Sequence, residues 1–353
     1  PPPPPPPPHF SSPSRNPRFG FKSRGLGDVY KRQAFVRLAL ARGASVVNVD
    51  KLTYAGNPAN LADVADDPRY EFVHGDIADA PLMREALPGC DAVVNLAAES
   101  HVDRSILAPA EFPRTDVVGT TVLLDAARTA GVDRFVQVST DVVYGSIRRG
   151  AFRETDPLEP SSPYSASKAG GDLQVLAWHR TFGMDTVITR GSNTFGPRQY
   201  PEKLIPLFVT NAIDGLPLPV YGDGMQIRDW IFVEDHCEGV WTALERGAAG
   251  AVYNVGGGNE ATNIEITRRI LDLTGRGDEL ITYVADRPGH DRRYALDTTR
   301  LRELGWAPAH PFATALEQTV RWFEGSREWW GPIKSGAYRE YYEAQYGDRG
   351  GAS

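Results

Sequence analysis

The chain has 353 residues, and its 38 Lys and Arg against 45 Asp and Glu give a formal net charge of −7. A hydrophobic fraction of 41% with 24% charged residues is ordinary for a globular protein, which excludes a chain disordered throughout. The acidic balance argues against non-specific binding to nucleic acid or to anionic membranes. Only Cys90 and Cys237 are present and no stretch reaches ~18 apolar residues, so we expect a cytoplasmic protein with no metal site and no membrane span.

Residues 1–33 differ in composition and hydrophobic pattern from the rest of the chain. The prolines at 1–8 favour an extended polyproline II conformation, and the residues after them have no apolar period. The segment lacks the ~7–15-residue apolar stretch of a signal peptide. We therefore interpret 1–33 as a non-native or disordered segment, foreign to the folded protein and joined to it between Gln33 and Ala34.

From Ala34 onward, short β-branched runs alternate with segments of helical spacing. Strands that alternate with ~10–15-residue helices indicate an α/β fold with a doubly wound parallel sheet, the Rossmann-like class. We assign residues 34–195 to this sheet, with a returning segment near 229–257, and residues 196–353 to a smaller mixed α/β lobe. The predicted helices are 34–43, 81–89, 117–131 and 164–182, and the predicted strands are 45–50, 70–76, 91–98, 134–140 and 185–192.

Polar side chains follow several of the predicted strands. In a doubly wound sheet, ligands bind beyond the carboxyl ends of the strands. Asp50 ends one strand, where its carboxylate can accept hydrogen bonds from both ribose hydroxyls of a dinucleotide and would repel a 2′-phosphate, which favours NAD over NADP. The alternative is that Asp50 caps the following turn. Asp76 follows the next strand, and the small residues of NLAAES at 95–100 allow a dinucleotide to approach the backbone closely.

The string YSASK places Tyr164 and Lys168 four residues apart, on one face of a helix. A phenol has a reference pKa near ~10, and a neighbouring ammonium favours the phenolate, which can act as a base. Thr140 lies 24 residues before Tyr164, at a predicted strand end, and supplies a hydroxyl. A tyrosine and a lysine at this spacing are typical of the proton-transfer site of short-chain dehydrogenases.

Longer strings carry a more specific resemblance: DKLTYAGN at 50–57, LAAESHVDRSI at 96–106, SPYSASKAG at 162–170, PEKLIP at 201–206, YGDGMQIRDWIFVEDHC at 221–237 and DRPGHDRRYALD at 286–297. The chain from about Ala34 to Trp306 resembles the extended short-chain dehydrogenases that act on nucleotide sugars, and among them the dTDP-glucose 4,6-dehydratases. The strings DKLTYAGN, AESHVDRS and DRPGHDRRYA are highly specific, whereas YSASK is shared across the wider superfamily.

The resemblance implies NAD as cofactor, a nucleotide sugar as substrate, and a homodimer formed through the helices near 117–131 and 164–182. It implies catalytic roles for Thr140, Asp141, Tyr164 and Lys168. It implies NAD contacts from Asp50, Lys51, Leu52, Thr53, Asp76, Ile77, Leu96, Ala97, Ala98, Thr115, Tyr164 and Lys168. It implies sugar and nucleotide contacts from Ser100, Thr140, Asn193, Lys203, Leu204, Pro219, Tyr221, Arg228, Asn263, Asp286, Arg287, Pro288, Gly289 and His290. Of these, Lys203 and Arg228 carry the charge to pair with a diphosphate.

The resemblance also implies a reaction, that of a hydro-lyase which supplies deoxysugar biosynthesis with a 4-keto-6-deoxy sugar. Tyr164 would take the proton of the sugar 4-hydroxyl while hydride leaves C4 for NAD, and the new ketone would acidify the C5 hydrogen. Asp141 would protonate the departing C6 hydroxyl, which requires a raised pKa for this carboxyl at neutral pH. Hydride would then return to C6.

Three features depart from the family pattern. Val142 stands where the family string STDEVYG has the glutamate that removes the C5 proton, and Thr194 stands where a second Asn commonly follows Asn193. No apolar strand and TGGxGFIG-type glycine turn precede Ala34, so we expect the first strand and its phosphate loop to be missing. Either another group replaces the base, or dehydration is slow, or the protein is an NDP-sugar 4-epimerase or related C4 oxidoreductase, or it is an impaired member that binds a nucleotide sugar without turnover.

Overall fold

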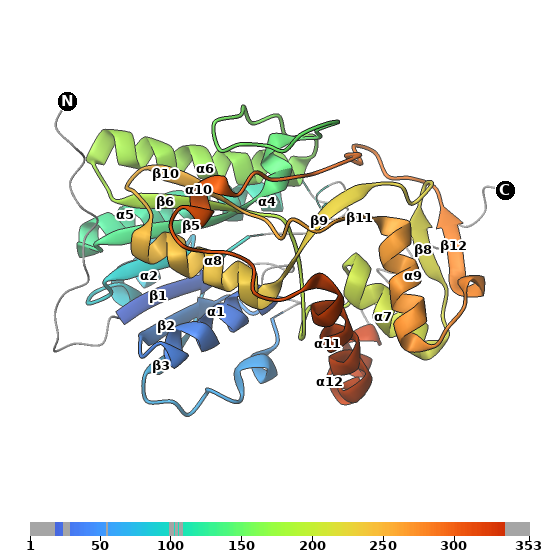
Figure 1. Ribbon diagram of the computed structural model, residues 1–353. Coiled ribbons are helices and arrows are strands. Elements are labelled where there is room, and N and C mark those ends of the chain that lie inside the picture. Colours follow the sequence, from blue (N-terminus) through green and yellow to red (C-terminus); the bar gives the residue numbers. More distant parts are fainter. Residues whose placement is uncertain are drawn as a thin grey trace.

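Seven parallel strands form the central sheet of the computed structural model, in the order β10-β6-β5-β4-β1-β2-β3 (Figure 1). This order confirms the expected doubly wound parallel sheet. The structure describes residues 18–23, 29–53, 56–98, 102, 105 and 109–335. The strands of the sheet are β1 (Arg18–Ser23), β2 (Ser45–Asp50), β3 (Tyr70–His74), β4 (Ala92–Asn95), β5 (Arg134–Thr140), β6 (Thr186–Gly191) and β10 (Ala251–Val255).

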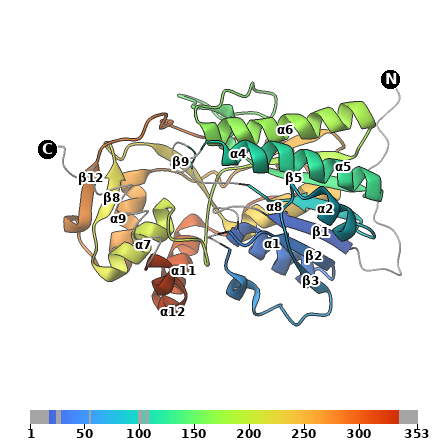
Figure 2. The ribbon, with the colours of Figure 1, turned by 180° about the vertical axis from the view of Figure 1, so that it is seen from behind.

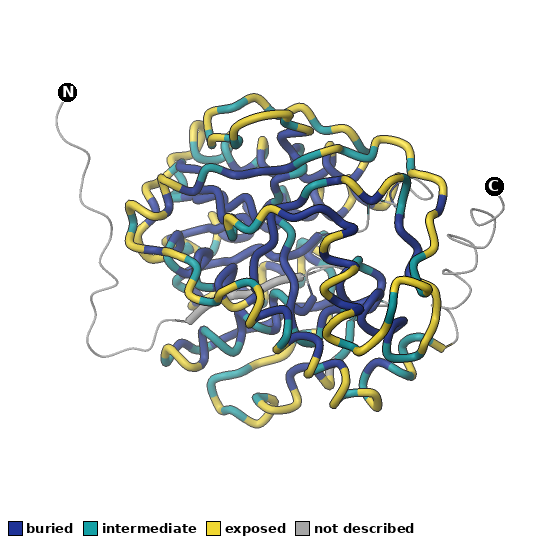
Figure 3. The backbone as a smooth tube through the Cα atoms, turned by 45° about the vertical axis from the view of Figure 1, so that its right-hand side comes forward, coloured by how far each residue is buried: buried dark blue, intermediate teal, exposed yellow. Residues whose placement is uncertain are grey.

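Helices cover both faces of this sheet, so its central strands are buried on both sides (Figures 1 and 2). On β2, Val46 belongs to one apolar cluster and Val47 to the cluster on the opposite face, because successive side chains of a strand alternate. In Figure 3 the buried backbone runs through the middle of the molecule. One face carries α1 (Val29–Ala41) and α8 (Val233–Arg246), and the other carries α2 (Ala80–Ala86), α5 (Thr120–Ala130) and α6 (Pro163–Phe182).

Most elements predicted after Ala34 lie close to the observed ones. The strands expected at 45–50 and 134–140 have the bounds of β2 and β5. The helix expected at 164–182 is α6, and the helix expected at 117–131 is α5, preceded by a π-helical segment, η2 (Arg114–Gly119). The short segments between these elements are η1 (Pro58–Leu61), α4 (Glu111–Pro113) and η3 (Asp141–Tyr144).

A short strand, β1, lies inside the sheet, and the expected absence of the family's first strand and glycine turn stays a prediction. β1 lies between β2 and β4 and pairs in parallel with both, from Arg18 opposite Ser45 to Ser23 opposite Asp50 on the β2 side. Two neighbouring strands with a gap between them present N–H and C=O groups that any extended segment can satisfy, because ladder pairing uses only the backbone. The first helix also begins earlier than expected, at Val29. The turn over 24–28 lies outside the described residues.

A second group of elements lies beyond one end of the central sheet, to the right in Figure 1 and to the left in Figure 2. It contains a three-stranded sheet in the order β11-β9-β7 and a two-stranded sheet of β12 and β8. Its strands are β7 (Asn193–Phe195), β8 (Leu218–Tyr221), β9 (Ile227–Phe232), β11 (Glu260–Thr262) and β12 (Ile281–Val284). Its helices are α7 (Leu204–Asp214), α9 (Asn263–Thr274), η4 (Asp278–Leu280), α11 (Phe312–Gly325) and α12 (Arg327–Lys334), while α10 (Thr299–Arg302) lies beside β10.

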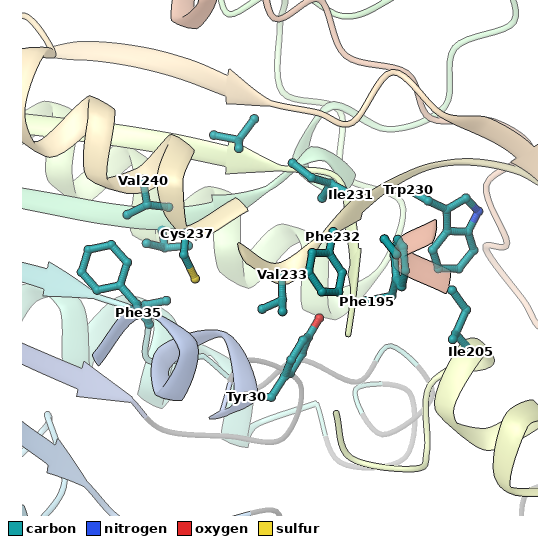
Figure 4. Close-up of a cluster of buried hydrophobic side chains, with 14 of the residues drawn as sticks. Tyr30, Phe35, Phe195, Ile205, Trp230, Ile231, Phe232, Val233, Cys237 and Val240 are labelled. Atoms are coloured by element: carbon teal, nitrogen blue, oxygen red, sulfur yellow. The ribbon is translucent and has the colours of Figure 1, made fainter. Parts of the chain in front are cut away.

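One continuous apolar cluster joins this second group to the central sheet (Figure 4). It runs from Phe35 on α1 and Val240 on α8 through Phe232 and Phe195 to Trp230. The Phe195 ring contacts the Phe232 and Trp230 rings at centroid distances of 5.8 and 6.4 Å. This packing holds β7, β9 and α7 against the carboxyl ends of the central strands. No described helix is both long and apolar enough to cross a membrane.

Candidate active site

A cavity of ≈ 230 Å³ lies at the carboxyl end of the central sheet, between the sheet and the second group of elements. Its wall brings together segments that are far apart in the sequence: the end of β5, the start of α6, the starts of α1 and α7, and the lobe loop near 287–294. This is the place where a doubly wound sheet binds its ligands. Of the residues expected at the site, the wall contains Thr140, Asp141, Tyr164, Asn193, Lys203, Leu204, Pro219, Tyr221, Arg228, Asn263, Arg287 and His290.

The start of α6 places Tyr164 at this cavity. Ser162 caps the helix by accepting a hydrogen bond from the Ser165 N–H, and Pro163 takes the first helical position, where its missing N–H costs nothing. Tyr164 is 7% exposed, and Lys168 follows one turn later on the same face. Lys168 is buried and donates from Nζ to the Val138 carbonyl of β5 at 3.0 Å. This hydrogen bond holds the ammonium between α6 and β5.

Thr140 and Asp141 stand where β5 ends and η3 begins. The Thr140 hydroxyl donates to Asp141 Oδ1 at 3.1 Å, whereas Asp141 Oδ2 has no hydrogen-bond partner among the described residues. Burial raises the pKa of Asp141 to about 7; the Asp229 charge adds to the rise, while the Thr140 hydrogen bond and the Arg228 and Lys31 charges oppose it. This carboxyl can therefore be protonated at neutral pH, as an acid at this position requires.

Asp229 lies behind Asp141, on β9. Its Oδ1 accepts a hydrogen bond from the Asn259 N–H at 2.8 Å, and its side chain is buried. Burial raises the pKa of Asp229 to about 6. Burial thus raises the pKa of two neighbouring carboxyls, of which Asp141 lines the cavity.

The raised pKa of Asp229 predicts a pH-dependent gain in stability for Asp229→Asn. The pKa of Asp229 is about 6 in the folded state, against 3.8 for the unfolded chain. Ionised Asp229 therefore lowers the free energy of unfolding by an amount that grows from about pH 3.8 and is complete above pH 6. We expect the variant to unfold with a free energy about 3 kcal/mol higher than the parent at pH 8 and about half as much higher at pH 5. Urea unfolding at both pH values measures this, with the exposed Asp278→Asn as control. An equal difference at both pH values would contradict the assignment.

Asp50, expected to hold a ribose, ends β2 as predicted but is already paired. Its Oδ2 lies 2.6 Å from Nη2 of Arg32, in the first turns of α1, and both side chains are buried. Asp50 Oδ1 accepts from the Leu52 N–H at 3.0 Å, and Leu52 takes a left-handed backbone with φ 49°. Nε and Nη1 of Arg32 have no hydrogen-bond partner among the described residues. A ribose at Asp50 must therefore compete with a guanidinium.

The other residues expected to contact a dinucleotide line the carboxyl edge of β2, β3 and β4. Lys51 and Asp76 form an ion pair at 3.2 Å. Leu96, Ala97 and Ala98 directly follow β4 and are buried, as is Ile77 after β3 and Thr115 within η2, while Thr53 follows Leu52 and is partly exposed. Tyr164 and Lys168 lie further along the sheet, on α6 beside β5, whereas at the β2 end of this edge the Asp50 carboxylate is paired with Arg32.

Cationic and aromatic groups form the part of the cavity farther from the sheet. Arg228 is buried, donates to the Ile227 and Asp291 carbonyls at 2.8 and 2.9 Å, and lies over the Tyr294 ring at 4.3 Å. Lys203 is the N-cap residue of α7, so that an anion here would meet both an ammonium and the positive end of a helix.

The loop over 286–290, expected to contact the nucleotide, is stabilised by contacts among its own side chains. Burial, with the Arg287 and Arg228 charges, lowers the pKa of His290 to about 4, and its Nδ1 lies 2.6 Å from Asp286 Oδ1. Gly289 has φ +65°, where a Cβ would also lie 3.0 Å from the Ser161 carbonyl, which favours glycine. Asp286, Pro288 and Gly289 are not part of the cavity wall as described, and Ser100 lies outside the described residues.

Several wall residues were not singled out from the sequence. Tyr30 and Lys31 belong to the segment set aside as foreign, although Tyr30 donates from its hydroxyl to the Thr194 carbonyl at 2.7 Å. Glu202 and Tyr294 lie inside the strings PEKLIP and DRRYALD, where their own roles had no separate signal. Within the described residues, no three His, Cys, Asp or Glu side chains gather as a metal site.

Comparisons with known proteins show which family this chain belongs to. A family model described as GDP-mannose 4,6 dehydratase matches residues 33–319. The dTDP-glucose 4,6-dehydratase of Streptomyces niveus is 52% identical over 308 residues, covering 85% of this chain and 92% of that protein. The crystal structure of DesIV, a dTDP-glucose 4,6-dehydratase from Streptomyces venezuelae with NAD bound, is similar with a TM-score of 0.87 and 52% identity over 90% of this chain and 100% of that one. A UDP-glucose 4-epimerase from Thermotoga maritima is less similar, with a TM-score of 0.81 and 28% identity over 88% of this chain and 99% of that one.

Proposed function

This chain belongs to the GDP-mannose 4,6 dehydratase family, and on that premise we propose that it is an NAD-dependent dTDP-glucose 4,6-dehydratase, a hydro-lyase that makes a 4-keto-6-deoxy sugar. The observation that supports this most is a single cavity that joins the Thr140 and Tyr164 hydroxyls to the Asp141 carboxyl and to the cations Lys203 and Arg228. The first three residues suit proton transfers on a sugar, and the two cations suit a diphosphate.

The proposed roles follow from where each group lies. NAD, when bound, supplies the hydride acceptor for C4 and the hydride donor for C6. Tyr164 takes the proton of the 4-hydroxyl, and the Thr140 hydroxyl forms a hydrogen bond with the same sugar oxygen. The Lys168 ammonium favours the phenolate form of Tyr164. Asp141, whose pKa of about 7 allows protonation, gives a proton to the leaving C6 oxygen.

Incubation of the purified chain with NAD and dTDP-glucose tests this function. We expect the 4-keto-6-deoxy product, identified by mass spectrometry and NMR. Val142 and the similarity to an epimerase make a C4-inverted sugar the competing outcome. That sugar alone would replace the proposal by epimerisation, and substrate binding without either product would replace it by a binding role.

Arg32→Ser is expected to raise the affinity for NAD about 10–100-fold, because Asp50 becomes free to accept two ribose hydroxyls and each hydrogen bond to a charged group contributes ~1.5–3 kcal/mol. Titration calorimetry measures the dissociation constant directly. The matched control is Arg37→Ser on the same helix, whose guanidinium pairs with the more exposed Asp63 at 2.7 Å. Weaker binding by Arg32→Ser would mean that Arg32 itself contacts the cofactor.

We also propose a homodimer formed through α5 and α6. These helices pack side by side on one face of the sheet, and the large apolar side chains Val118, Leu173 and Phe182 on η2 and α6 are 50–58% exposed. Exposed apolar side chains on elements that pack against each other are typical of an association surface. We place the dimer in the cytoplasm, since Cys90 and Cys237 are buried and form no disulfide.

Leu173→Glu is expected to weaken the dimer at least ~100-fold, because pairing through α6 would bury an unpaired carboxylate. Size-exclusion chromatography with light scattering over a dilution series measures the dissociation. Leu216→Glu is the control, since Leu216 is a comparably exposed leucine after α7, away from α5 and α6. A parent chain that is monomeric throughout, or an undiminished Leu173→Glu dimer, would contradict the proposal.

A further inference from the structure

The residue that follows Asp141 in the cavity wall carries no carboxyl group. Val142 lies in the wall at the position where the family resemblance implies a glutamate, and an isopropyl group cannot accept the C5 proton. Of the described wall residues, only Asp141 and Glu202 carry carboxyl groups. His290 is a poor candidate, because its lowered pKa of about 4 makes it a weak base and its Nδ1 contacts Asp286.

The surroundings of Asp141 leave one of its oxygens available for chemistry. Oδ1 is held by the Thr140 hydroxyl at 3.1 Å, and Oδ2 is buried without a hydrogen-bond partner among the described residues. Thr140 is its direct neighbour in the chain, and both line the cavity with Tyr164. A carboxyl anchored next to the groups proposed for C4 is therefore close to the adjoining carbon of the same sugar ring.

We infer that Asp141 performs both proton transfers of the dehydration, taking the proton from C5 through Oδ2 and then, as the protonated carboxyl, giving a proton to the C6 hydroxyl. This inference rests on the proposed function. In the 4-ketosugar, the C5–H bond breaks and its electron pair becomes the C4–C5 enolate, while Asp141 becomes protonated. The enolate then re-forms the ketone with a C5=C6 double bond as the C6–O bond breaks. The leaving hydroxyl takes the proton from Asp141, so that water departs and the carboxylate is restored.

The charges around Asp141 suit a group that must both accept and release a proton. Asp229 on β9 favours the protonated form, whereas Arg228 on β9 and Lys31 on α1 favour the carboxylate, and the Thr140 hydroxyl also stabilises the charge. The resulting pKa of about 7 leaves both forms populated at neutral pH. One carboxyl can then supply a base and an acid in sequence, where two groups with separated pKa values divide these roles in other enzymes.

Deuterium exchange separates this assignment from its rivals. Asp141→Asn and Glu202→Gln are each mixed with NAD and dTDP-glucose in D₂O, and C4 oxidation, deuterium at C5 and water loss are followed separately by nicotinamide absorbance and mass spectrometry. We expect Asp141→Asn to retain C4 oxidation but to lose C5 deuteration and water loss together, each by about 10²–10⁴-fold. Glu202→Gln should keep both within about tenfold of the parent. Circular dichroism and the dissociation constant for substrate establish that each variant is folded.

Two results would overturn the inference. C5 deuteration that persists in Asp141→Asn while water loss stops would make Asp141 an acid only, and loss of C5 deuteration in Glu202→Gln would make Glu202 the base. The pH profile of the parent adds an independent measurement: C5 exchange that starts from the carboxylate rises through pH 7, whereas a step that needs protonated Asp141 falls. A parent that oxidises C4 but neither exchanges C5 nor loses water would instead defeat the proposed function itself.

Discussion

Val142→Glu is expected to accelerate dehydration about 10²–10⁴-fold, the range that a positioned general base contributes. The position lies in the cavity wall directly after Asp141, so a carboxylate there would divide the base and acid roles between two neighbours. A second carboxylate would also raise the pKa of Asp141 further, because like charges disfavour ionisation. The measurement is the single-turnover rate of 4-keto-6-deoxy product formation.

The control for this change is Val142→Gln, which has the size and polarity of glutamate but is not a base. If it accelerates dehydration as much as Val142→Glu does, the gain comes from shape or hydration of the cavity and not from proton abstraction. A pH profile distinguishes the two carboxyl arrangements as well. The parent should show a rise with pH, and Val142→Glu should show a bell, since one group must be ionised and the other protonated.

Tyr164→Phe is expected to slow C4 oxidation by about 10²–10⁴-fold while substrate affinity changes little. The variant keeps the ring at the cavity and removes only the hydroxyl that takes the 4-hydroxyl proton. The ring packs edge-on against Phe112 at a centroid distance of 6.2 Å, so the fold should tolerate the loss. Nicotinamide reduction in a single turnover measures the chemical step, and titration calorimetry measures substrate binding.

Tyr221→Phe provides the comparison, because Tyr221 lies in the same wall but on the lobe side, against His290 at a centroid distance of 5.9 Å. Loss of the Tyr221 hydroxyl should weaken substrate binding and leave the rate of C4 oxidation nearly unchanged. Equal effects of the two substitutions on the oxidation rate would remove the special role assigned to Tyr164.

Local sequence patterns predicted the strands and helices of the central sheet. β2 and β5 are valine-rich segments buried on both faces, and short apolar runs of this length predict strands of a parallel sheet. The spacing of Tyr164 and Lys168 predicts that both lie on one face of α6, as they do. Several of the residues that the motif strings single out line one cavity, because a resemblance to a family carries three-dimensional information that periodicity lacks; their roles stay predictions.

The remaining features depend on contacts between segments with no local signature. The Arg32–Asp50 pair forms because packing of α1 against the sheet brings a guanidinium to the end of β2. The pKa of Asp141 depends on Asp229 and Arg228, which β9 brings from nearly ninety residues further along the chain. The pairing of β1 was not anticipated, because RFGFKS shows no apolar run, and backbone pairing in a gap between two strands does not require one.

The junction between β9 and α8 determines how the cavity can change its width. β9 ends at Phe232 and α8 begins at Val233, so the chain passes from the lobe sheet to the face of the central sheet with no linker between them. A swinging motion of the second group against the central sheet would need a pliable joint here, and it would have to part the apolar cluster that crosses the junction from Phe35 and Val240 to Phe232. The direct junction and the shared cluster therefore favour a fixed spacing between Tyr164 and Lys203 across the cavity. On the proposed function, this spacing would select nucleotide sugars whose diphosphate meets Lys203 when their sugar lies at Tyr164.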